Sequence, residues 1–586
     1  MDALKKVFSI LSFSEKLSFI TIFIFILIVS ILETFSVALV LPAIKFLISD
    51  NFVNEVIIFF KNYFSLDVDK ASIIVFGLLF ILFFFIFKFF FVAITHYLQL
   101  KYLLGLLVTK CNFLYQGYLS MGYEEYTKTQ SPILIRNVSI LVDKFNSTIQ
   151  NCFTIFTDFF LFIGVVGLLV YYDSKSTFFI FVIFLFLSLA YYFGTRTKFY
   201  SWGDKATKIE SKKLKFLYEG IFSIKEIKLS NSINYFVKEY SNSVFIHGRL
   251  SLLRNFIKSL PKMSYELLAV ISLVVIGLTF ISEKKSLDEF IPISGVFAVA
   301  AFKILPAGNR ILLAFQNLLF DLASLNILNT EISKIKKDKL ILSYNENIPK
   351  FSFNSEIKIS NVDFAYESSG RKILSNINLI IKKNSTIGII GESGAGKSTL
   401  MDIMIGLLKP TSGFVTCDGI DINTNISSWH KTLGYVPQNI NLLDDTIASN
   451  VAFGIDKNQI DTDRVFECIS LSRLETFVKN SDYGIMTNVG ERGIKLSGGQ
   501  IQRIGVARSL YKKPDILFFD ESTSSLDVKT EEDMMKSVNE LLKNITKIII
   551  SHRIVTLKNC DVIYYLKNGT IYDFGDYQKM SKIKYD

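Results

Sequence analysis

The sequence predicts two domains, an α-helical membrane domain with six spans followed by an α/β domain. Long apolar runs punctuate the chain up to about residue 330. From about residue 355 the apolar runs shorten to strand length and glycines cluster at turns, which is typical of a mostly parallel sheet. Half of the 586 residues are hydrophobic and the mean hydropathy is +0.38, values typical of a membrane protein. We therefore divide the chain into a membrane domain (1–330), a polar linker (331–354) and an α/β domain (355–586).

The apolar runs give six predicted spans, most of them near the ~20 residues that cross a ~30 Å hydrocarbon layer. They lie at about 17–47, 72–100, 146–172, 177–195, 262–282 and 290–315. Residues 196–260 hold 13 Lys or Arg against 5 Asp or Glu and follow an even number of spans, which places them and the N-terminus in the cytoplasm. Residues 101–145 lie on the same side. Both segments are expected to continue as helices out of the membrane, with turns near 123–132 and 218–227 that could touch the cytoplasmic α/β domain.

Composition excludes several classes of protein. We assign the formal charge of +11 to cytoplasmic loops and contact with anionic lipid, and expect no nucleic-acid binding. The five cysteines are scattered and lack a CxxC pair, which favours free thiols over disulfides or a zinc site. The N-terminus shows no cleavable signal peptide.

A phosphate-binding loop is predicted in STIGIIGESGAGKSTLMDIMIGLL (385–408). A buried strand runs into the spacing GxxxxGK[ST], and a helix follows, so that backbone N–H groups can curl around phosphates. Lys397 is expected to reach the β- and γ-phosphates and Ser398 to bind Mg²⁺. The whole loop comprises Gly391, Glu392, Ser393, Gly394, Ala395, Gly396, Lys397, Ser398 and Thr399.

A second element, PDILFFDES (514–522), is predicted to be a central strand that ends in two acids. Asp520 is placed to hold Mg²⁺, and Glu521 to orient and polarise the attacking water. The alternative is a strand that simply ends in a solvated Asp-Glu pair. The phosphate loop upstream favours the catalytic interpretation.

A third element, KLSGGQIQRIGVARSL (495–510), places Ser497, Gly498, Gly499 and Gln500 at the start of a helix. This is a second anion-binding helix N-terminus in one chain. Two phosphate cradles for one nucleotide predict a head-to-tail pair of identical chains, in which each serine-glycine cradle closes on the phosphate loop of the other chain.

In this order and spacing the three elements resemble the ATPase domain of ABC transporters. The resemblance implies that Tyr366 stacks on adenine, that Gln438 senses Mg²⁺ and signals to the membrane half, and that His552 contacts the γ-phosphate. NVGERG (488–493) and SSLD (524–527) agree with the family. The resemblance thus implies an active ATPase that uses ATP and Mg²⁺, with Glu521, His552 and Lys397 catalytic, in an exporter-type half-transporter.

Charged residues inside the spans raise the question of cargo. Lys303 and Arg310 lie seven residues apart in FAVAAFKILPAGNRILLAF (297–315), hence on nearly one helical face. With Lys88 and Lys262 they make four cations, opposed by one acid, Glu33. Charge at membrane depth costs roughly 2.5–3.5 kcal/mol per residue on insertion scales. An anionic substrate in a water-filled cavity would justify that cost. The alternative is that the lysines snorkel to an interface and Arg310 pairs with an acid.

Apolar side chains of NFVNEVIIFFKNYF (51–64) form one helical stripe, which predicts a short amphipathic helix outside the membrane. This segment and four other stretches resemble bacterial flippases of lipid-linked oligosaccharides, of the Campylobacter and Helicobacter glycosylation type. The four stretches are ETFSVALVLP (33–42), LPAGNRI (305–311), IGESGAGKSTLMDIMIGLLKP (390–410) and YVPQNINLLDDTIASNVAFG (435–454). The resemblance implies a homodimer in the bacterial inner membrane and an anionic polyprenyl-pyrophosphate substrate whose tail contacts the outer helix.

Other functions remain open at this point. The chain could export a small peptide or another amphiphile, and only about sixteen residues precede the first span, too few for a peptidase domain. A channel or a non-transporting ATPase scaffold is less compatible with the complete hydrolytic set. The six spans argue against a soluble nucleic-acid ATPase.

Overall fold

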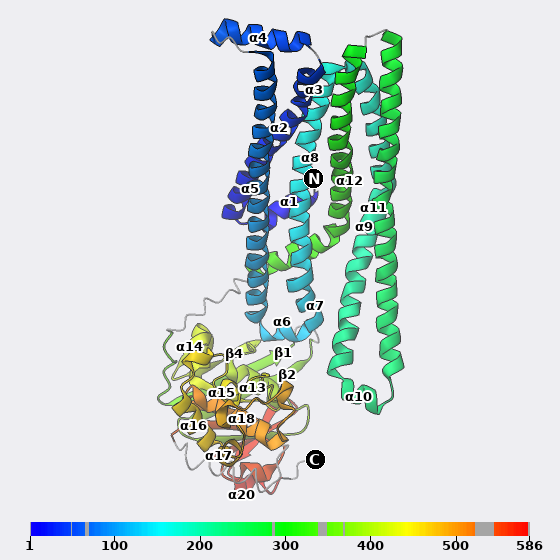
Figure 1. Cartoon of the computed structure of the whole chain (residues 1–586). Helices are drawn as coiled ribbons and strands as arrows, with labels where there is room; N and C mark the ends of the chain where they lie inside the picture. The colour runs from blue at the N-terminus through cyan, green and yellow to red at the C-terminus, as the bar shows by residue number, and fades with distance from the viewer. Residues whose placement is uncertain are drawn as a thin grey trace. The chain divides into compact units, whose positions relative to one another are not determined.

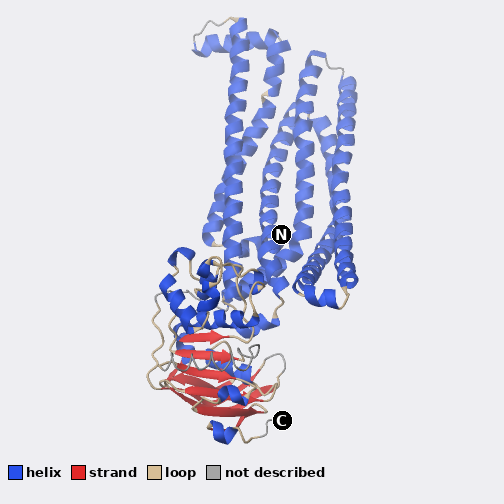
Figure 2. Cartoon of the chain, turned by 60° about the horizontal axis from the view of Figure 1, so that its bottom comes forward, coloured by secondary structure: helices blue, strands red, loops and turns tan. Residues whose placement is uncertain are grey.

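The computed structural model describes residues 2–48, 50–64, 69–283, 287–337, 348–366, 370–521 and 544–583. The chain forms two compact units, one of Met1–Met121 with Thr129–Leu342, and one of Gly122–Lys128 with Ser343–Asp586. The first unit is helical and the second contains the strands (Figures 1 and 2). The predicted order, a helical domain followed by an α/β domain, is confirmed.

The helical unit consists of α-helices and one π-helical turn, η1. They are α1 (Asp2–Ile10), α2 (Phe13–Ala38), α3 (Val40–Ile48), α4 (Asp50–Phe64), α5 (Lys70–Leu119), α7 (Ser131–Arg136), η1 (Asn137–Leu141), α8 (Val142–Tyr172), α9 (Ser174–Phe222), α10 (Ile224–Leu229), α11 (Ile233–Glu283) and α12 (Leu287–Lys337). Several run far past the ~20 residues that a membrane needs, so the long helices continue beyond a membrane-spanning stretch.

Five stretches of described helix are long and apolar enough to cross a membrane: Phe13–Leu47, Lys70–Leu119, Ser131–Tyr172, Ser174–Phe222 and Gly295–Lys337. The remaining predicted span, 262–282, lies within α11, and some of its side chains fall outside the described residues. Helix α4 covers the segment predicted to be amphipathic and exposes Ile58 and Tyr63.

Local sequence sets where these helices begin. Ser12 caps α2, accepting from the N–H of Glu15, whose carboxylate accepts from the N–H of Ser12 in return. Asp173 caps α9 directly after α8 ends, so these two long helices form a tight hairpin. Within α5, apolar side chains cover several faces, with Phe83 and Phe89 more than 60% exposed. A helix that is apolar all round is suited to lipid.

Glycine allows α9 and α12 to approach closely. A Cβ on Gly203 would lie 1.9 Å from the carbonyl oxygen of Phe320, so only a residue without a side chain fits there. Gly203→Ala should destabilise the helical unit by the about 1–3 kcal/mol typical of overpacking, which a thermal-unfolding midpoint in detergent would report. Gly194→Ala, on the same helix with nothing within 4 Å, is the matched control. An equal effect of both substitutions would contradict close packing at Gly203.

The second unit contains two sheets. Their strands are β1 (Glu356–Ala365), β2 (Lys372–Lys382), β3 (Thr386–Gly391), β4 (Ser412–Cys417), β5 (Ile420–Asp421), β6 (Leu433–Val436), β7 (Ile516–Asp520), β8 (Thr546–Ile550), β9 (Val562–Lys567) and β10 (Thr570–Gly575). One sheet is antiparallel with the order β2-β1-β4-β5. The other has the order β10-β9-β3-β8-β7-β6, and all its strands except β10 run parallel.

Short helices complete this unit. They are α6 (Tyr123–Lys128), α13 (Lys397–Ile405), α14 (Ile426–Thr432), α15 (Ile447–Val451), α16 (Thr462–Leu471), α17 (Glu475–Lys479), α18 (Gly498–Tyr511) and α20 (Tyr577–Met580).

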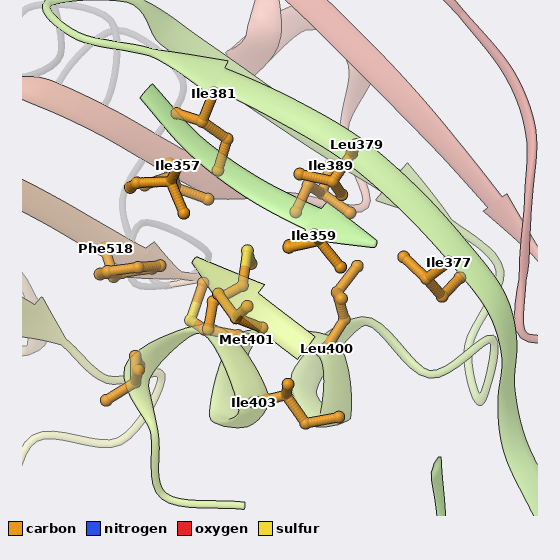
Figure 3. Close-up of a cluster of buried hydrophobic side chains, with 14 of the residues drawn as sticks. Ile357, Ile359, Ile377, Leu379, Ile381, Ile389, Leu400, Met401, Ile403 and Phe518 are labelled. Carbon is orange, nitrogen blue, oxygen red and sulfur yellow. The ribbon is translucent and has the colours of Figure 1, made fainter. Parts of the chain in front are cut away.

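A hydrophobic core joins both sheets to α13 (Figure 3). Ile357 and Ile381 come from the antiparallel sheet, Ile389 and Phe518 from the parallel sheet, and Leu400 from the helix that follows the phosphate loop. All five side chains are at most 1% exposed. Close packing of this kind transmits small shifts instead of absorbing them, so the phosphate loop has a rigid base.

Candidate nucleotide site and membrane cavity

Several of the predicted nucleotide residues lie at one edge of the parallel sheet. Strands β3, β8, β7 and β6 are neighbours and parallel, so their carboxyl ends lie side by side. The phosphate loop follows β3, His552 follows β8, Glu521 follows β7 and Gln438 follows β6. Open α/β sheets bind ligands at this edge.

The phosphate loop is a tight turn between β3 and α13. Gly396 has φ of 101°, a conformation that favours glycine, and is the N-cap of α13. Lys397 is buried, and its Nζ donates to the carbonyl oxygens of Gly391 (2.8 Å) and Glu392 (2.9 Å). Burial lowers the pKa of Lys397, and the charges of Glu521 and Asp520 oppose that shift. The amine thus sits inside the loop that is predicted to hold phosphates.

Glu392 belongs to the loop by sequence, but its side chain points to β9. Its carboxylate accepts a hydrogen bond from the Tyr565 hydroxyl at 3.4 Å and pairs with the Lys567 amine at 3.4 Å. These contacts anchor the loop to a neighbouring strand. Only the backbone of Glu392 is then available to bind phosphates.

Glu521 occupies a strained position immediately after β7. Its φ is 45°, left-handed for a residue with a side chain, and strain of this kind concentrates at functional sites. The amide nitrogen of Gln438 donates to the Glu521 carboxylate at 3.0 Å. The Nδ1 atom of His552 lies 3.8 Å from the same carboxylate oxygen. Three residues from three strand ends are therefore brought together.

Asp520 ends β7 beside other acids. Burial raises its pKa and the charge of Glu521 adds to the effect, while the Tyr435 hydroxyl, 3.4 Å from Asp520 Oδ2, opposes it. Asp402 on α13 is half-buried, and desolvation together with the charge of Asp520 raises its pKa to about 6. Crowded acids of this kind favour a bound cation.

The donor atoms here fit Mg²⁺. Ser398, Asp520 and Gln438 offer a hydroxyl, a carboxylate and an amide oxygen, which are hard ligands. In the described part of the chain no group of three or more His, Cys, Asp or Glu could hold a metal ion. Mg²⁺ commonly takes one or two carboxylates and completes its shell with substrate phosphates and water, so this sparse donor set suits a nucleotide-bound ion.

Tyr366 follows β1 and packs edge-on against Phe364, with ring centroids 4.9 Å apart. Its hydroxyl lies 3.5 Å from Thr399 Oγ1 on the helix after the phosphate loop. The predicted adenine-stacking residue and the phosphate loop are thus adjacent. The stacking itself stays a prediction.

The serine-glycine element begins α18. Ser497 is its N-cap and forms a reciprocal cap with Gln500, in which the N–H of Ser497 donates to Gln500 Oε1 at 2.8 Å. Ser497 and Gly498 are exposed, and Gly499 follows in the first turn. The hydrogen bonds found for Ser497 and Gln500 in the described part of the chain stay within α18. The predicted motif at 524–527 lies outside the described residues.

Helix α6 belongs to the nucleotide unit although it lies between α5 and α7 of the helical unit in sequence. Burial raises the pKa of the Tyr123 phenol, and the nearby charges of Asp402, Tyr366 and Asp520 contribute. Tyr123 is therefore close to the acids of the nucleotide site. The predicted turn near 123–132 covers this helix.

In the helical unit, three of the four predicted membrane cations have acidic partners. Glu33 accepts from Lys88 at 3.1 Å and from Lys303 at 2.7 Å, and Lys88 also donates to the hydroxyl of Ser36. One carboxylate on α2 thus joins lysines on α5 and α12.

Arg310 pairs with a different acid, Asp158 on α8. Its Nε and Nη2 atoms donate to the two carboxylate oxygens at 2.8 and 2.6 Å. The prediction from the sequence opposes only Glu33 to the four cations and misses Asp158, which interrupts the apolar run of residues 153–172. An acid inside a predicted span was itself the signal. Lys303 and Arg310 share a helical face, but their partners lie on different helices.

Lys262 and Arg310 line a cavity of about 450 Å³ between α11 and α12, together with Glu266. Because α11 and α12 run antiparallel, these charged residues lie at one end of the cavity, and Leu273, Phe297 and other apolar residues line the opposite end. No ion pair of Lys262 is found within the described residues. The cavity is amphipathic.

A polar seam runs along α12 with a period of seven residues. Each member bonds to another helix: the first to α2, the next two to α8, and the last two to α9 and α5. The members are Lys303, Arg310, Asn317, Ser324 and Glu331, and their partners are Glu33, Asp158, Asn151, Thr207 and Tyr118. Residues two turns apart share one helical face, so the seam connects the cavity with the far end of α12.

Comparison with known proteins places the second unit in a family. Residues 374–524 match the family model described as ABC transporter. The chain is 35% identical over 227 residues to an ATP-dependent lipid A-core flippase of Ralstonia nicotianae, covering 38% of each chain. It is 37% identical over 256 residues to the alpha-hemolysin translocation ATP-binding protein HlyB of Escherichia coli O157:H7, covering 44% of this chain and 35% of that protein. The chain thus spans well under half the length of these curated relatives.

Similarity over the full length comes from a solved structure, that of a bacterial Atm1-family ABC exporter with ATP bound. The TM-score is 0.67, with 19% sequence identity, and the match covers 93% of this chain and 95% of that one. The nucleotide unit is an ABC transporter ATPase domain, and the chain as a whole has the fold of an ABC exporter.

Proposed function

We propose that the protein is an ATP-driven exporter that works as a homodimer in the inner membrane of a bacterium, with its N-terminus and nucleotide unit in the cytoplasm. The observation that carries the proposal is the convergence of the phosphate loop, Gln438, Glu521 and His552 on one sheet edge in a chain with membrane-length helices. An ATP-hydrolysing site attached to such helices supports transport, and the exporter fold agrees with it.

In the proposed mechanism the residues of this chain mainly bind and position ATP and the attacking water. The phosphate loop and Lys397 bind the phosphates, Tyr366 holds the adenine, and Glu521 orients the attacking water and accepts its proton. Gln438 and His552 hold the Glu521 carboxylate in place. Mg²⁺, held by Ser398, Asp520 and Gln438, would neutralise the phosphate charge. Little covalent chemistry is required of the protein.

Coupling to the membrane helices would run through α6. Because α6 belongs to the nucleotide unit and connects α5 to α7, closure of two nucleotide units would pull directly on both helices. The π-helical turn η1 follows α7, and π-turns often mark functional sites in helices. The predicted turn near 218–227, which overlaps α10, would be a second coupling segment.

For the cargo we propose a lipid-linked oligosaccharide on a polyprenyl-pyrophosphate carrier. The amphipathic cavity supports an amphiphile, because charged residues gather at one end and apolar residues at the other. The exposed apolar side chains of α4 suit contact with a lipid tail. A relative named for lipid A-core flipping agrees with a lipid cargo, and one named for alpha-hemolysin translocation keeps export of a peptide as the alternative.

The test is transport by the full chain in proteoliposomes. ATP-dependent flipping of a polyprenyl-pyrophosphate oligosaccharide is expected for the wild type and should be absent for Glu521→Gln. ATP turnover without flipping would reject the lipid-linked cargo while retaining the exporter, and acidic peptides would then be tested in the same vesicles. Absence of ATP turnover would reject the whole proposal.

A further inference from the structure

The pair between Arg310 and Asp158 is unequal in exposure. The side chain of Asp158 is 3% exposed and that of Arg310 is 49% exposed. The carboxylate is thus enclosed where α8 packs on α12, whereas the half-exposed side chain of Arg310 lines the cavity that Lys262 and Glu266 also line. The Nε and Nη2 donors of the guanidinium bond to the two carboxylate oxygens of Asp158, a bidentate arrangement.

Charge in this part of the helical unit is nearly balanced. Glu33 serves both Lys88 and Lys303, Asp158 serves Arg310, and Glu266 lies in the same cavity as Lys262. Four cations with three acids leave a formal charge of +1, far less than the cations alone suggest. An anionic ligand that enters the cavity therefore meets an arginine whose bidentate fork already holds a carboxylate.

We infer that Asp158 is an internal anion that competes with substrate for Arg310, and that it thereby sets how strongly the cavity binds anionic head groups. The inference rests on the proposed function in that the cavity receives an amphiphile. An anionic head group competes with Asp158 for the positive charge of the guanidinium, and it takes the Nε and Nη2 donors only by displacing Asp158. Displacement leaves a buried carboxylate without its partner, which is costly. Because anionic head groups are then bound weakly, the protein can release its cargo, since binding that is too favourable prevents exit.

The position of the pair explains how its strength could change during a cycle. Arg310 lies in the polar seam of α12, and the next member, Asn317, bonds to Asn151 on the same partner helix α8. A small shift of α12 along α8 lengthens both contacts together. The availability of Arg310 is then linked to the conformation of the helical unit.

The test measures binding of dodecyl phosphate and of dodecanol, an anionic and a neutral probe of equal chain length, to full-length protein in phosphatidylcholine nanodiscs. Asp158→Asn keeps the shape of the side chain and removes its charge. It should lower the Kd for dodecyl phosphate at least tenfold and change the Kd for dodecanol less than twofold. The double variant Asp158→Asn/Arg310→Gln, which leaves no buried charge, should return the phosphate Kd to within twofold of wild type.

Each outcome decides the inference. If Asp158→Asn binds dodecyl phosphate no more tightly than wild type, Asp158 does not compete. If Asp158→Asn does not fold, the comparison of wild type with the double variant still tests the inference. Wild type binding the phosphate at least tenfold more tightly than the double variant would show that Arg310 is already open, which overturns the inference, whereas equal binding supports it. If neither probe binds wild type, the cavity takes no amphiphile and the proposed cargo fails with it. Probe binding without flipping of the oligosaccharide rejects only the proposed cargo.

Discussion

Replacing Glu521 by glutamine should lower ATP turnover at least about 100-fold, the lower range for loss of a general base, and leave ATP binding within about twofold of wild type. The physical reason is that glutamine keeps the size of the side chain and cannot accept the proton of the attacking water. The phosphate loop and Tyr366 do not change, so the nucleotide still has its binding groups. Steady-state phosphate release measures turnover, and equilibrium binding of a fluorescent ATP analogue measures affinity.

The geometry around Glu521 strengthens this expectation. Its carboxylate is held by Gln438 at 3.0 Å, close to His552, on a backbone with φ of 45° that stores strain. These constraints fix the position of the Glu521 carboxylate, as its role as general base requires. Glu475→Gln is the matched control, because Glu475 begins α17 and bonds to Ser470. Turnover above about a tenth of wild type in Glu521→Gln would reject Glu521 as the base.

Local motifs could be predicted from the sequence because their chemistry is local. A buried strand that meets GESGAGKS and continues as a helix has one well-known solution, and the structure has β3, a left-handed Gly396 and α13 in that order. The strand ending in Asp520 is equally local. The apolar runs predicted membrane helices for the same reason, since a run of ~20 apolar residues is long enough to span the bilayer.

Contacts between distant helices could not be predicted in this way. Arg310 and Asp158 are 152 residues apart, and their pairing depends on how α8 and α12 pack. The seven-residue spacing of Lys303 and Arg310 predicted a shared face, but it does not say that one meets Glu33 and the other Asp158. The sequence predicted that the turn near 123–132 could touch the α/β domain, but not that α6 belongs to the nucleotide unit. These features come from tertiary packing, which no short stretch encodes.

Gly498→Asp should lower ATP turnover at least about 100-fold, because a like charge against the nucleotide phosphates costs several kcal/mol. Gly498 is the first residue of α18 and is exposed. An acid at a helix N-terminus stabilises the helix itself, so the fold should persist. ATP binding to the phosphate loop of the same chain should change less than twofold if the serine-glycine element serves the partner chain. Thr462→Asp, at the first and exposed position of α16, is the control.

Mixed dimers distinguish a shared site from one built within a single chain. With Glu521→Gln in both chains to prevent turnover, one chain carries Gly498→Asp and the other Lys397→Ala. In a head-to-tail dimer the intact phosphate loop of the first chain faces the intact serine-glycine element of the second. One site is therefore complete and the other lacks both elements. Such dimers should retain ATP through gel filtration, whereas dimers of either variant alone should not. Equal loss in the mixed dimers would mean that the two elements of one chain serve the same nucleotide.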